Sequence, residues 1–245
     1  MQVKDERQLR RQFCEVGAWM YERGYVVGTD GSLSARLAVN SYLMTPTGSC
    51  LGRMQPEEMV LTDAGGLPQR TGRDPTGDWR LHLTCYRERP EVRCVVHAHP
   101  PWCLAASVGG VSLDRHVLPD VVLALGTIPT ALYFTPGTQE AADAVRSLIG
   151  LHDAVLLDHH GALTVGETLE EAFTRLESME LLAQVLVAGH ALGAIKVLPK
   201  AEVEKLKAMR KAMGLKAEAV QPDPSWAPDG TRGPARKPDE GAAGR

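Results

Sequence analysis

The sequence predicts an α/β protein, because helical and strand patterns alternate along its 245 residues. Near the N-terminus, apolar side chains recur with helical spacing and predict an amphipathic helix over residues 5–23. The side chains of this apolar stripe are Leu9, Phe13, Val16 and Met20. A capping box at residues 168–171 predicts a second long helix that runs to about Gly189. Between these helices, apolar and β-branched runs predict strands over residues 91–96 and 153–157.

Shorter elements are expected in the rest of the chain. Asp74 is the expected N-cap of a helix that begins at Pro75 and runs to about Arg89. In such a helix, free backbone N–H groups of Thr76 and Gly77 would point outward at the N-terminus, where phosphate binds readily. Further expected elements are strands over residues 42–44 and 129–133, and helices over residues 104–108, 138–148 and 201–213.

Composition limits the classes of partner. The net charge is −3 and the basic residues are scattered, so we expect neither a nucleic-acid partner nor an acidic membrane partner. The charged first eleven residues do not have the apolar core of a signal peptide, and no apolar stretch approaches the length of a membrane span. The five cysteines are an odd number without CxxC spacing, which indicates reduced thiols and a cytoplasmic location.

The hydrophobic content of 44% is enough for one large core, so we expect a single domain over residues 1–215. Residues 216–245 are rich in proline, glycine and charged side chains and poor in apolar ones. Such a composition cannot bury enough apolar surface to offset the entropy of ordering the chain. The sequence therefore predicts a disordered C-terminal tail.

Histidines follow two of the predicted strands. His97 and His99 are two residues apart in an extended segment, so their side chains point to the same face. His159 and His160 follow the strand over residues 153–157, and because neighbouring residues face opposite ways, only one of this pair is expected to join the first two. Three imidazoles on one divalent cation leave a coordination position open for a substrate. The alternative is that these are ordinary buried histidines without a metal.

Loops of glycine and hydroxyl residues lie before these strands, at residues 28–34, 45–48 and 74–78. Such loops can bring backbone N–H groups and hydroxyls close to an anion, although plain turns have the same composition. Because neither a P-loop nor GxGxxG is present, a sugar phosphate is favoured over a nucleotide. Asp78 lies in the expected first helical turn, where it either complements the helix dipole or, beside a metal, serves as ligand or base.

Five segments, taken in order, resemble the class II aldolase/adducin family over residues 8–215. They are GTDGSLSAR at residues 28–36, MTPTG at 44–48, DWRLH at 78–82, VVHAH at 95–99 and DHHG at 158–161. Each segment alone is a weak indication of the family, but five segments in this order make the resemblance specific. The resemblance implies an α-β-α layered fold, with a central, mostly antiparallel sheet flanked by helices. It also implies one catalytic domain over residues 1–215 and a homotetramer with active sites between neighbouring subunits.

The resemblance also implies roles for single residues. The histidines that match the metal ligands of the family are His97, His99 and His160. The implied ion is Zn²⁺, with Mn²⁺ or Co²⁺ as alternatives. Asp78 matches the catalytic glutamate, which ligates the metal at rest and then transfers a proton. The residues that match the phosphate-binding positions are Ser32, Thr47, Gly48, Thr76 and Gly77. Ser32 stands where these aldolases usually have asparagine, whose amide reaches further.

The activity implied by the resemblance is reversible cleavage of a ketose or deoxyketose 1-phosphate to dihydroxyacetone phosphate and an aldehyde, through a metal-stabilised enediolate. Such aldolases use two tyrosines at the aldehyde oxygen. This chain has Met213 before the last Gly-Leu and no tyrosine near Pro119 and Asp120. A metal-dependent decarboxylase of a 3-keto or aromatic acid needs no such phenol and is therefore the main alternative.

Two further readings stay open at this point. Sugar-phosphate epimerases of the family also carry aspartate at the place of Asp78. Adducin-type members are interaction modules without catalysis, and retention of all three histidines argues against that class for this chain.

Overall fold

The structure is a computed structural model, which describes residues 6–69 and 72–215. Its helices are α1 (Glu6–Glu22), η1 (Leu51–Arg53), η2 (Pro56–Glu58), α2 (Trp79–Glu88), α3 (Pro101–Val108), α4 (Pro119–Ala124), α5 (Gln139–Ile149), α6 (Leu169–Ala191) and α7 (Lys200–Ala212). Its strands are β1 (Ser32–Ala38), β2 (Ser41–Met44), β3 (Val60–Thr62), β4 (Cys94–Ala98), β5 (Thr130–Ala131), β6 (Ala154–Leu157) and β7 (Gly161–Gly166). η1 and η2 are short 3-10 helices.

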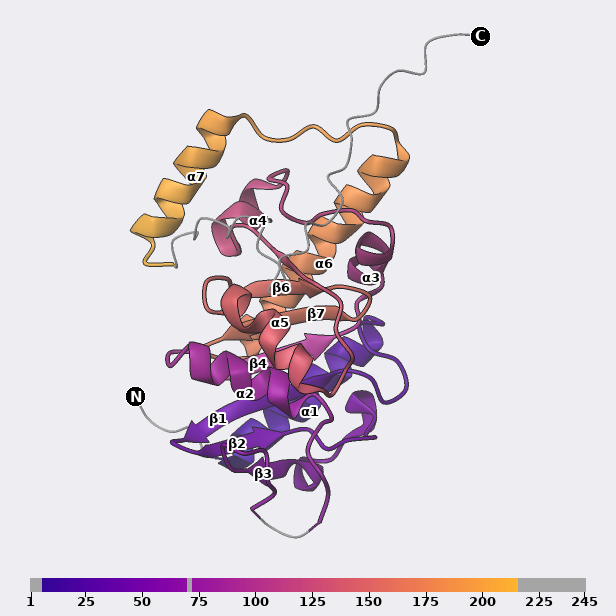
Figure 1. The fold of residues 1–245 in the computed structure, drawn as a ribbon, viewed down its shortest axis with the longest axis vertical. Helices are drawn as coiled ribbons and strands as arrows, with labels where there is room; N and C mark the ends of the chain where they lie inside the picture. Colours follow the sequence, from indigo (N-terminus) through magenta and orange to yellow (C-terminus); the bar gives the residue numbers. More distant parts are fainter. Residues whose placement is uncertain (1–5, 70–71, 216–245) are drawn as a thin grey trace.

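The seven strands of the described residues form a single sheet in the order β3-β2-β1-β4-β7-β6-β5 (Figure 1). All neighbouring strands are antiparallel except β5 and β6, which are parallel. The expected mostly antiparallel sheet is therefore confirmed. β4 lies at the centre, between β1 and β7, and this position makes its C-terminal end the meeting point of distant parts of the chain.

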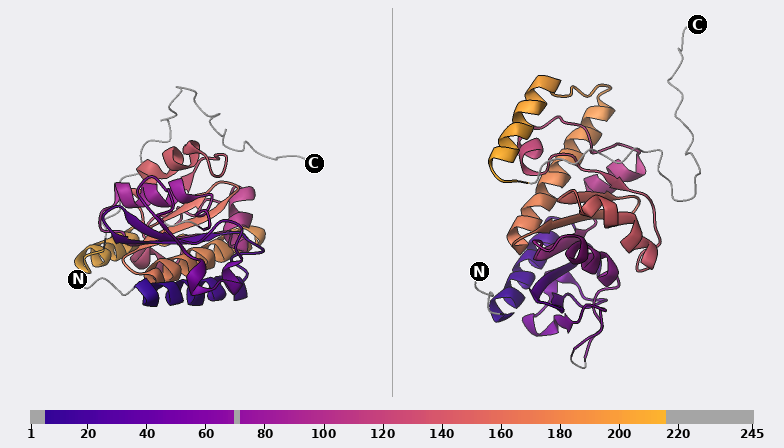
Figure 2. Two further views of the ribbon diagram at one scale, coloured as in Figure 1. Left: turned by 90° about the horizontal axis from the view of Figure 1, so that it is seen from below. Right: turned by 60° about the vertical axis from the view of Figure 1, so that its left-hand side comes forward.

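Helices cover both faces of the sheet, as the layered fold requires (Figure 2). α1 and α6 lie on one face, and α2 and α5 on the other. Because strand side chains alternate between faces, Val96 packs with α1 and α6, whereas its neighbour Val95 packs with α2 and α5. The central strands are therefore buried on both faces. This burial explains why they are strongly apolar and could be predicted from the sequence.

One predicted helix start is wrong. The helix expected from Pro75 begins only at Trp79, with Asp78 at its N-cap position. Pro75 forms a bridge with Pro46, and the Thr76 backbone N–H donates to the Thr45 carbonyl at 2.9 Å. The segment before α2 is therefore held in extended conformation by the 45–48 loop. As a result, the Thr76 N–H is not free at a helix N-terminus.

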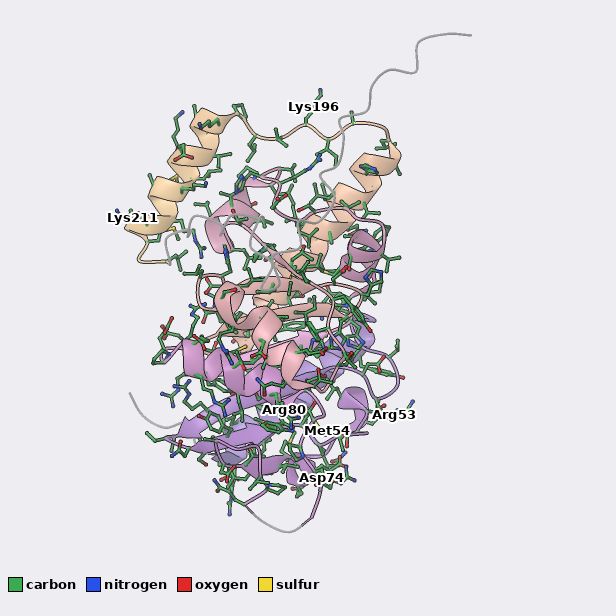
Figure 3. The ribbon with its side chains drawn as sticks, in the orientation of Figure 1. Arg53, Met54, Asp74, Arg80, Lys196 and Lys211 are labelled. Atoms are coloured by element: carbon green, nitrogen blue, oxygen red, sulfur yellow. The ribbon has the colours of Figure 1, made fainter. Side chains whose placement is uncertain are left out.

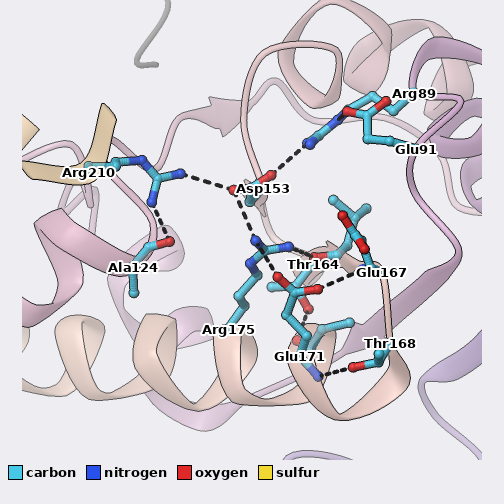
Figure 4. Close-up of polar contacts among 12 residues, drawn as sticks. Arg89, Glu91, Ala124, Asp153, Thr164, Glu167, Thr168, Glu171, Arg175 and Arg210 are labelled. Carbon is cyan, nitrogen blue, oxygen red and sulfur yellow. Dashed lines mark hydrogen bonds and ion pairs between the residues drawn. The ribbon is translucent and has the colours of Figure 1, made fainter. Parts of the chain in front are cut away.

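A charged cluster lies around Asp153, the residue directly before β6 (Figure 4). The Asp153 carboxylate accepts hydrogen bonds from Arg89 at 2.7 Å and from Arg210 at 3.0 Å, and forms an ion pair with Arg175 at 3.4 Å. Arg210 also donates to the Ala124 carbonyl at 2.6 Å, which ties α7 to α4. Burial raises the pKa of the Asp153 carboxyl, but the positive charges of Arg175, Arg89 and Arg210 outweigh this and hold it below its usual value of 3.8.

Two expectations concern the ends of the chain and membranes. The predicted disordered tail, residues 216–245, lies outside the described residues, so it and the domain boundary at residue 215 stay predictions. Within residues 6–69 and 72–215, no helix is both long and apolar enough to cross a membrane.

Candidate metal centre

Three histidines from two parts of the chain meet at the C-terminal end of β4. His97 lies on β4, His99 follows it, and His160 comes from the turn between β6 and β7. One ring nitrogen of each histidine lies within 4.8 Å of the other two. The Nε2 atoms of His97 and His99 are 3.3 Å apart. Two nitrogens bound tetrahedrally to one Zn²⁺ at ~2.1 Å would be separated by about 3.4 Å, so this spacing suits a shared ion.

The turn between β6 and β7 selects which histidine of the pair enters the cluster. His160 does, with its ring centre 4.7 Å from that of His97. His159 instead bonds through Nδ1 to the Asp158 carboxylate at 2.9 Å, and its side chain is 55% exposed. Gly161 follows with a φ of +137°, and a Cβ there would lie 2.2 Å from the Ala98 carbonyl oxygen. The close approach of β7 to the end of β4 therefore requires glycine at this position.

The electrostatic state of the cluster suits a cation. His97 Nδ1 lies 3.0 Å from the Ala162 carbonyl, which can only accept, so Nδ1 carries the proton and Nε2 keeps its lone pair for the cluster. Burial, followed by the charges of His160 and His99, holds the pKa of His97 well below 6.5. Burial also lowers the pKa of His160. Neutral imidazoles are the form that metals bind.

An unsatisfied nitrogen is the observation that tests the fit of a metal. His160 Nδ1 is buried and has no hydrogen-bond partner in the part of the chain that is described. His97 Nε2, which keeps its lone pair, faces His99 Nε2 at 3.3 Å. Buried polar atoms are normally paired, so the unpaired Nδ1 of His160 in a cluster of three histidines fits a divalent-cation site.

Two carboxylates approach the histidines. Asp78 Oδ2 lies 3.7 Å from His97 Nε2, with the Asp78 side chain 19% exposed. Asp30 Oδ2 lies 3.6 Å from His99 Nδ1. The sequence indicated Asp78 but not Asp30. Asp30 belongs to the glycine-rich 28–34 loop, which was expected to approach an anion rather than a metal. The Phe134 ring, also not anticipated, stands edge-on 5.5 Å from the His160 ring centre and forms an apolar side of the cluster.

The expected phosphate-binding residues fall into two groups. The backbone N–H groups of Thr47 and Thr76 are engaged, since they donate to the carbonyls of Asp74 and Thr45. Gly48 and Gly77 are open: a Cβ at either position would meet no atom within 4 Å.

Ser32, the fifth expected phosphate residue, is fully buried and lies directly opposite His97 in the pairing of β1 with β4. Figure 3 labels Asp74, whose carbonyl accepts from the Thr47 N–H, and Arg80 on α2, and both lie in the half of the molecule that holds β1 to β3.

Comparisons with known proteins agree with this architecture. The sequence profile of the class II aldolase and adducin N-terminal domain matches residues 11–187. A 3-oxo-tetronate 4-phosphate decarboxylase of Escherichia coli K12 is 33% identical over 188 residues, which are 75% of this chain and 88% of that protein. An L-fuculose phosphate aldolase of the same strain is 30% identical over 217 residues, 87% of this chain and 99% of its own.

Solved structures lead to the same family. YgbL from Escherichia coli, whose reaction is left open among aldolase, epimerase and decarboxylase, matches with a TM-score of 0.76 at 32% identity, over 82% of this chain and 98% of that one. An L-fuculose 1-phosphate aldolase matches with a TM-score of 0.77 at 25% identity, over 83% of this chain and 96% of that one. The chain therefore belongs to the class II aldolase and adducin family, as the five sequence segments indicated.

Proposed function

We propose that this protein is a zinc-dependent aldolase that reversibly cleaves a phosphorylated ketose to dihydroxyacetone phosphate and an aldehyde. The observation that carries this proposal is the cluster of three histidines with a carboxylate beside it. The cluster joins His97, His99 and His160, and Asp78 lies 3.7 Å from the first of them. Relatives that include an L-fuculose phosphate aldolase support the substrate class.

The residues would divide the work as follows. His97, His99 and His160 would hold the ion, which supplies Lewis-acid polarisation of a carbonyl oxygen when bound. Asp78, whose Oδ2 lies 3.7 Å from His97 Nε2, would exchange a proton with the carbon next to that carbonyl when the C3–C4 bond breaks. Its aspartate side chain is one methylene shorter than glutamate, and its N-cap position at the start of α2 aims it at His97.

The phosphate group would bind at the 45–48 loop, the segment before α2 and Ser32. The open backbone at Gly48 and Gly77 and the hydroxyls of Ser32, Thr47 and Thr76 are the groups proposed to receive it. We also propose a homotetramer with active sites between subunits, as the family resemblance implies. The side chains that meet the aldehyde end of the substrate would then come from a neighbouring copy.

A second candidate is decarboxylation of a phosphorylated 3-oxo acid. The 33% identity to a 3-oxo-tetronate 4-phosphate decarboxylase favours it directly. It is also consistent with the absence of tyrosine at Met213 and near Pro119 and Asp120. Loss of CO2 leaves an enolate that needs only one proton on carbon, so Asp78 would suffice and no phenol is required.

One experiment separates the two reactions. The zinc-loaded protein is incubated with dihydroxyacetone phosphate and a panel of short aldehydes, and separately with a 3-oxo acid 4-phosphate. The aldolase proposal predicts condensation products with at least one aldehyde and no CO2 release. CO2 release without condensation would replace the aldolase by the decarboxylase, and inactivity in both assays would reject both functions.

A further inference from the structure

A continuous row of hydrogen bonds runs from Ser32 into the layer between the sheet and α2. Ser32 Oγ lies 2.8 Å from His82 Nε2. His82 Nδ1 lies 2.7 Å from Ser34 Oγ, which in turn lies 2.7 Å from the Tyr86 hydroxyl. All four side chains are buried. No local pattern in the sequence indicates this row, because its contacts join β1 to a helix about fifty residues later.

His82 is neutral in this row. Its ring partners are the hydroxyls of Ser32 and Ser34, and no carboxylate contacts it in the described chain. Burial lowers the pKa of His82 to about 3, in agreement with this environment. A neutral imidazole has one N–H and one lone pair, so the two serines must play opposite roles toward it. The proton position on His82 therefore fixes the direction of the whole row.

The proton count allows two directions. If His82 carries its proton on Nε2, it donates to Ser32, accepts from Ser34, and Ser34 accepts from Tyr86. The Ser32 hydroxyl proton alone is then left to donate elsewhere. If His82 carries its proton on Nδ1, Ser32 donates to His82, and a proton of Ser34 or Tyr86 is left without an acceptor among the described residues.

The surroundings of the two ends favour the first direction. Tyr86 belongs to the buried apolar cluster that includes Met44, Val92 and Val95, with Tyr42 and Arg36 against its ring, and the described residues give its hydroxyl no acceptor besides Ser34. Ser32 lies opposite His97 across the β1–β4 pairing, beside the candidate metal centre. A phenol is also a stronger donor than acceptor, which favours donation from Tyr86 to Ser34, and hydrogen bonds in a chain strengthen one another.

We propose that Tyr86, Ser34 and His82 form a relay that fixes Ser32 as a hydroxyl donor to a phosphate oxygen of the substrate. His82 is the positioning residue in this relay. The proposal rests on the proposed function, because that function places the substrate phosphate at Ser32. It also explains how serine can stand where these aldolases usually have asparagine. An amide N–H always donates, whereas a hydroxyl donates in a fixed direction only when a neighbour sets that direction.

The proton position on His82 tests the relay directly. Long-range ¹H–¹⁵N correlation spectra of the zinc-loaded, histidine-labelled protein are expected to show His82 with its proton on Nε2. Tyr86→Phe is expected to shift the ring toward a mixture of both tautomers. Tyr42→Phe is the matched control, because the Tyr42 ring stacks on Tyr86 at 5.1 Å and its hydroxyl is not part of the row. A wild-type His82 protonated on Nδ1 would overturn the proposal.

Phosphate binding tests the purpose of the relay. With inorganic phosphate as the probe, calorimetry should show affinity reduced about 10-fold in Ser32→Ala and about 2- to 5-fold in Tyr86→Phe. The double variant should bind no more weakly than Ser32→Ala alone. Equal losses from Tyr86→Phe with and without the Ser32 hydroxyl would show a merely structural role and reject the relay.

These two measurements need no turnover. A protein that is inactive on every substrate but shows the Nε2 proton and the non-additive phosphate binding would refute the proposed reaction and leave the relay standing. An active protein whose Ser32→Ala variant binds phosphate normally would support the proposed reaction and reject the relay.

Discussion

β6 has a buried polar cluster at each end, and the two differ in how completely their atoms are paired. At its start, both oxygens of Asp153 contact guanidinium groups, at 2.7 Å from Arg89 and 3.0 Å from Arg210. Beyond its other end, His160 brings a buried Nδ1 without a partner in the described residues. A fully paired cluster destabilises the fold when one member is removed, whereas an incomplete one leaves atoms for a ligand. The contrast distinguishes a structural site from a functional one, although only the four residues of β6 separate them.

The largest expected effect lies at the incomplete end. His160→Ala should weaken zinc binding by more than about 100-fold, since even changes in the groups behind metal ligands cost 10- to 100-fold. Turnover should fall with it, while the thermal midpoint of the metal-free protein should change little. Metal content after gel filtration and activity are the measurements. His159→Ala is the matched control and should keep its zinc, because His159 faces Asp158. Equal losses in both variants would break the contrast.

At the complete end, stability rather than activity should suffer. Asp153→Asn removes the charge that holds Arg89, Arg175 and Arg210, and breaking a buried ion pair costs ~3–5 kcal/mol of unfolding free energy. Urea unfolding measures this difference. Glu91→Gln is the control: Glu91 also pairs with Arg89 but is 50% exposed, so its loss should cost less than ~1 kcal/mol. A comparable cost in both variants would mean that burial does not decide the strength of these pairs.

Acid should affect the two clusters in different pH ranges. Burial lowers the pKa of His97, so below the unfolded value of 6.5 the unfolded chain gains a proton that the metal-free folded chain does not, and stability begins to fall there. Asp153 has a pKa lowered mainly by Arg175 against the effect of burial, so its contribution is complete above 3.8 and is lost as pH falls through the folded pKa. Urea unfolding of the metal-free protein from pH 8 to pH 2 should show a decline that begins near 6.5, to which buried His82 also contributes, and a second decline below 3.8. Asp153→Asn should abolish only the lower one, and loss of the upper step in that variant would contradict the assignment.

The smallest effect concerns the helix that brings Arg175 to Asp153. The Thr168 side chain caps α6 by accepting a hydrogen bond from the Glu171 N–H at 3.1 Å. Thr168→Ala should therefore cost ~1 kcal/mol of unfolding free energy. Thr138→Ala is the matched control, because Thr138 holds the N-cap position of α5 without a capping bond and its hydroxyl donates instead to the Thr135 carbonyl, at 2.7 Å on the exposed surface. Its cost should be smaller, and the reverse order would show that cap geometry is not the cause.

The parts of the fold that the sequence predicted are those whose signal is local. The stripe of α1 and the Thr168 cap of α6 depend on residues within a few turns, and both helices are found within two residues of their expected ends. The same-face relation of His97 and His99 follows from strand geometry alone, and the structure shows it. Their role as zinc ligands stays a prediction.

The parts that were missed depend on contacts between distant segments. Thr76 was expected at a helix N-terminus because proline after Asp74 favours a helix start, but pairing with Thr45 overrides that preference. β7 was not predicted because its glycine and alanine residues have little strand propensity, and its position depends on pairing with β4 and β6. The row from Ser32 to His82 likewise joins segments that no sequence period connects.

The histidine cluster depends on a backbone constraint at Gly161 as well as on its three imidazoles. A methyl group there would collide with the Ala98 carbonyl oxygen, which belongs to the residue between His97 and His99. The two halves of the cluster thus depend on one hydrogen atom in place of a side chain. A related protein that kept all three histidines but had alanine at this position would hold β7 away from the end of β4. It would retain the ligands and lose the geometry that brings them together.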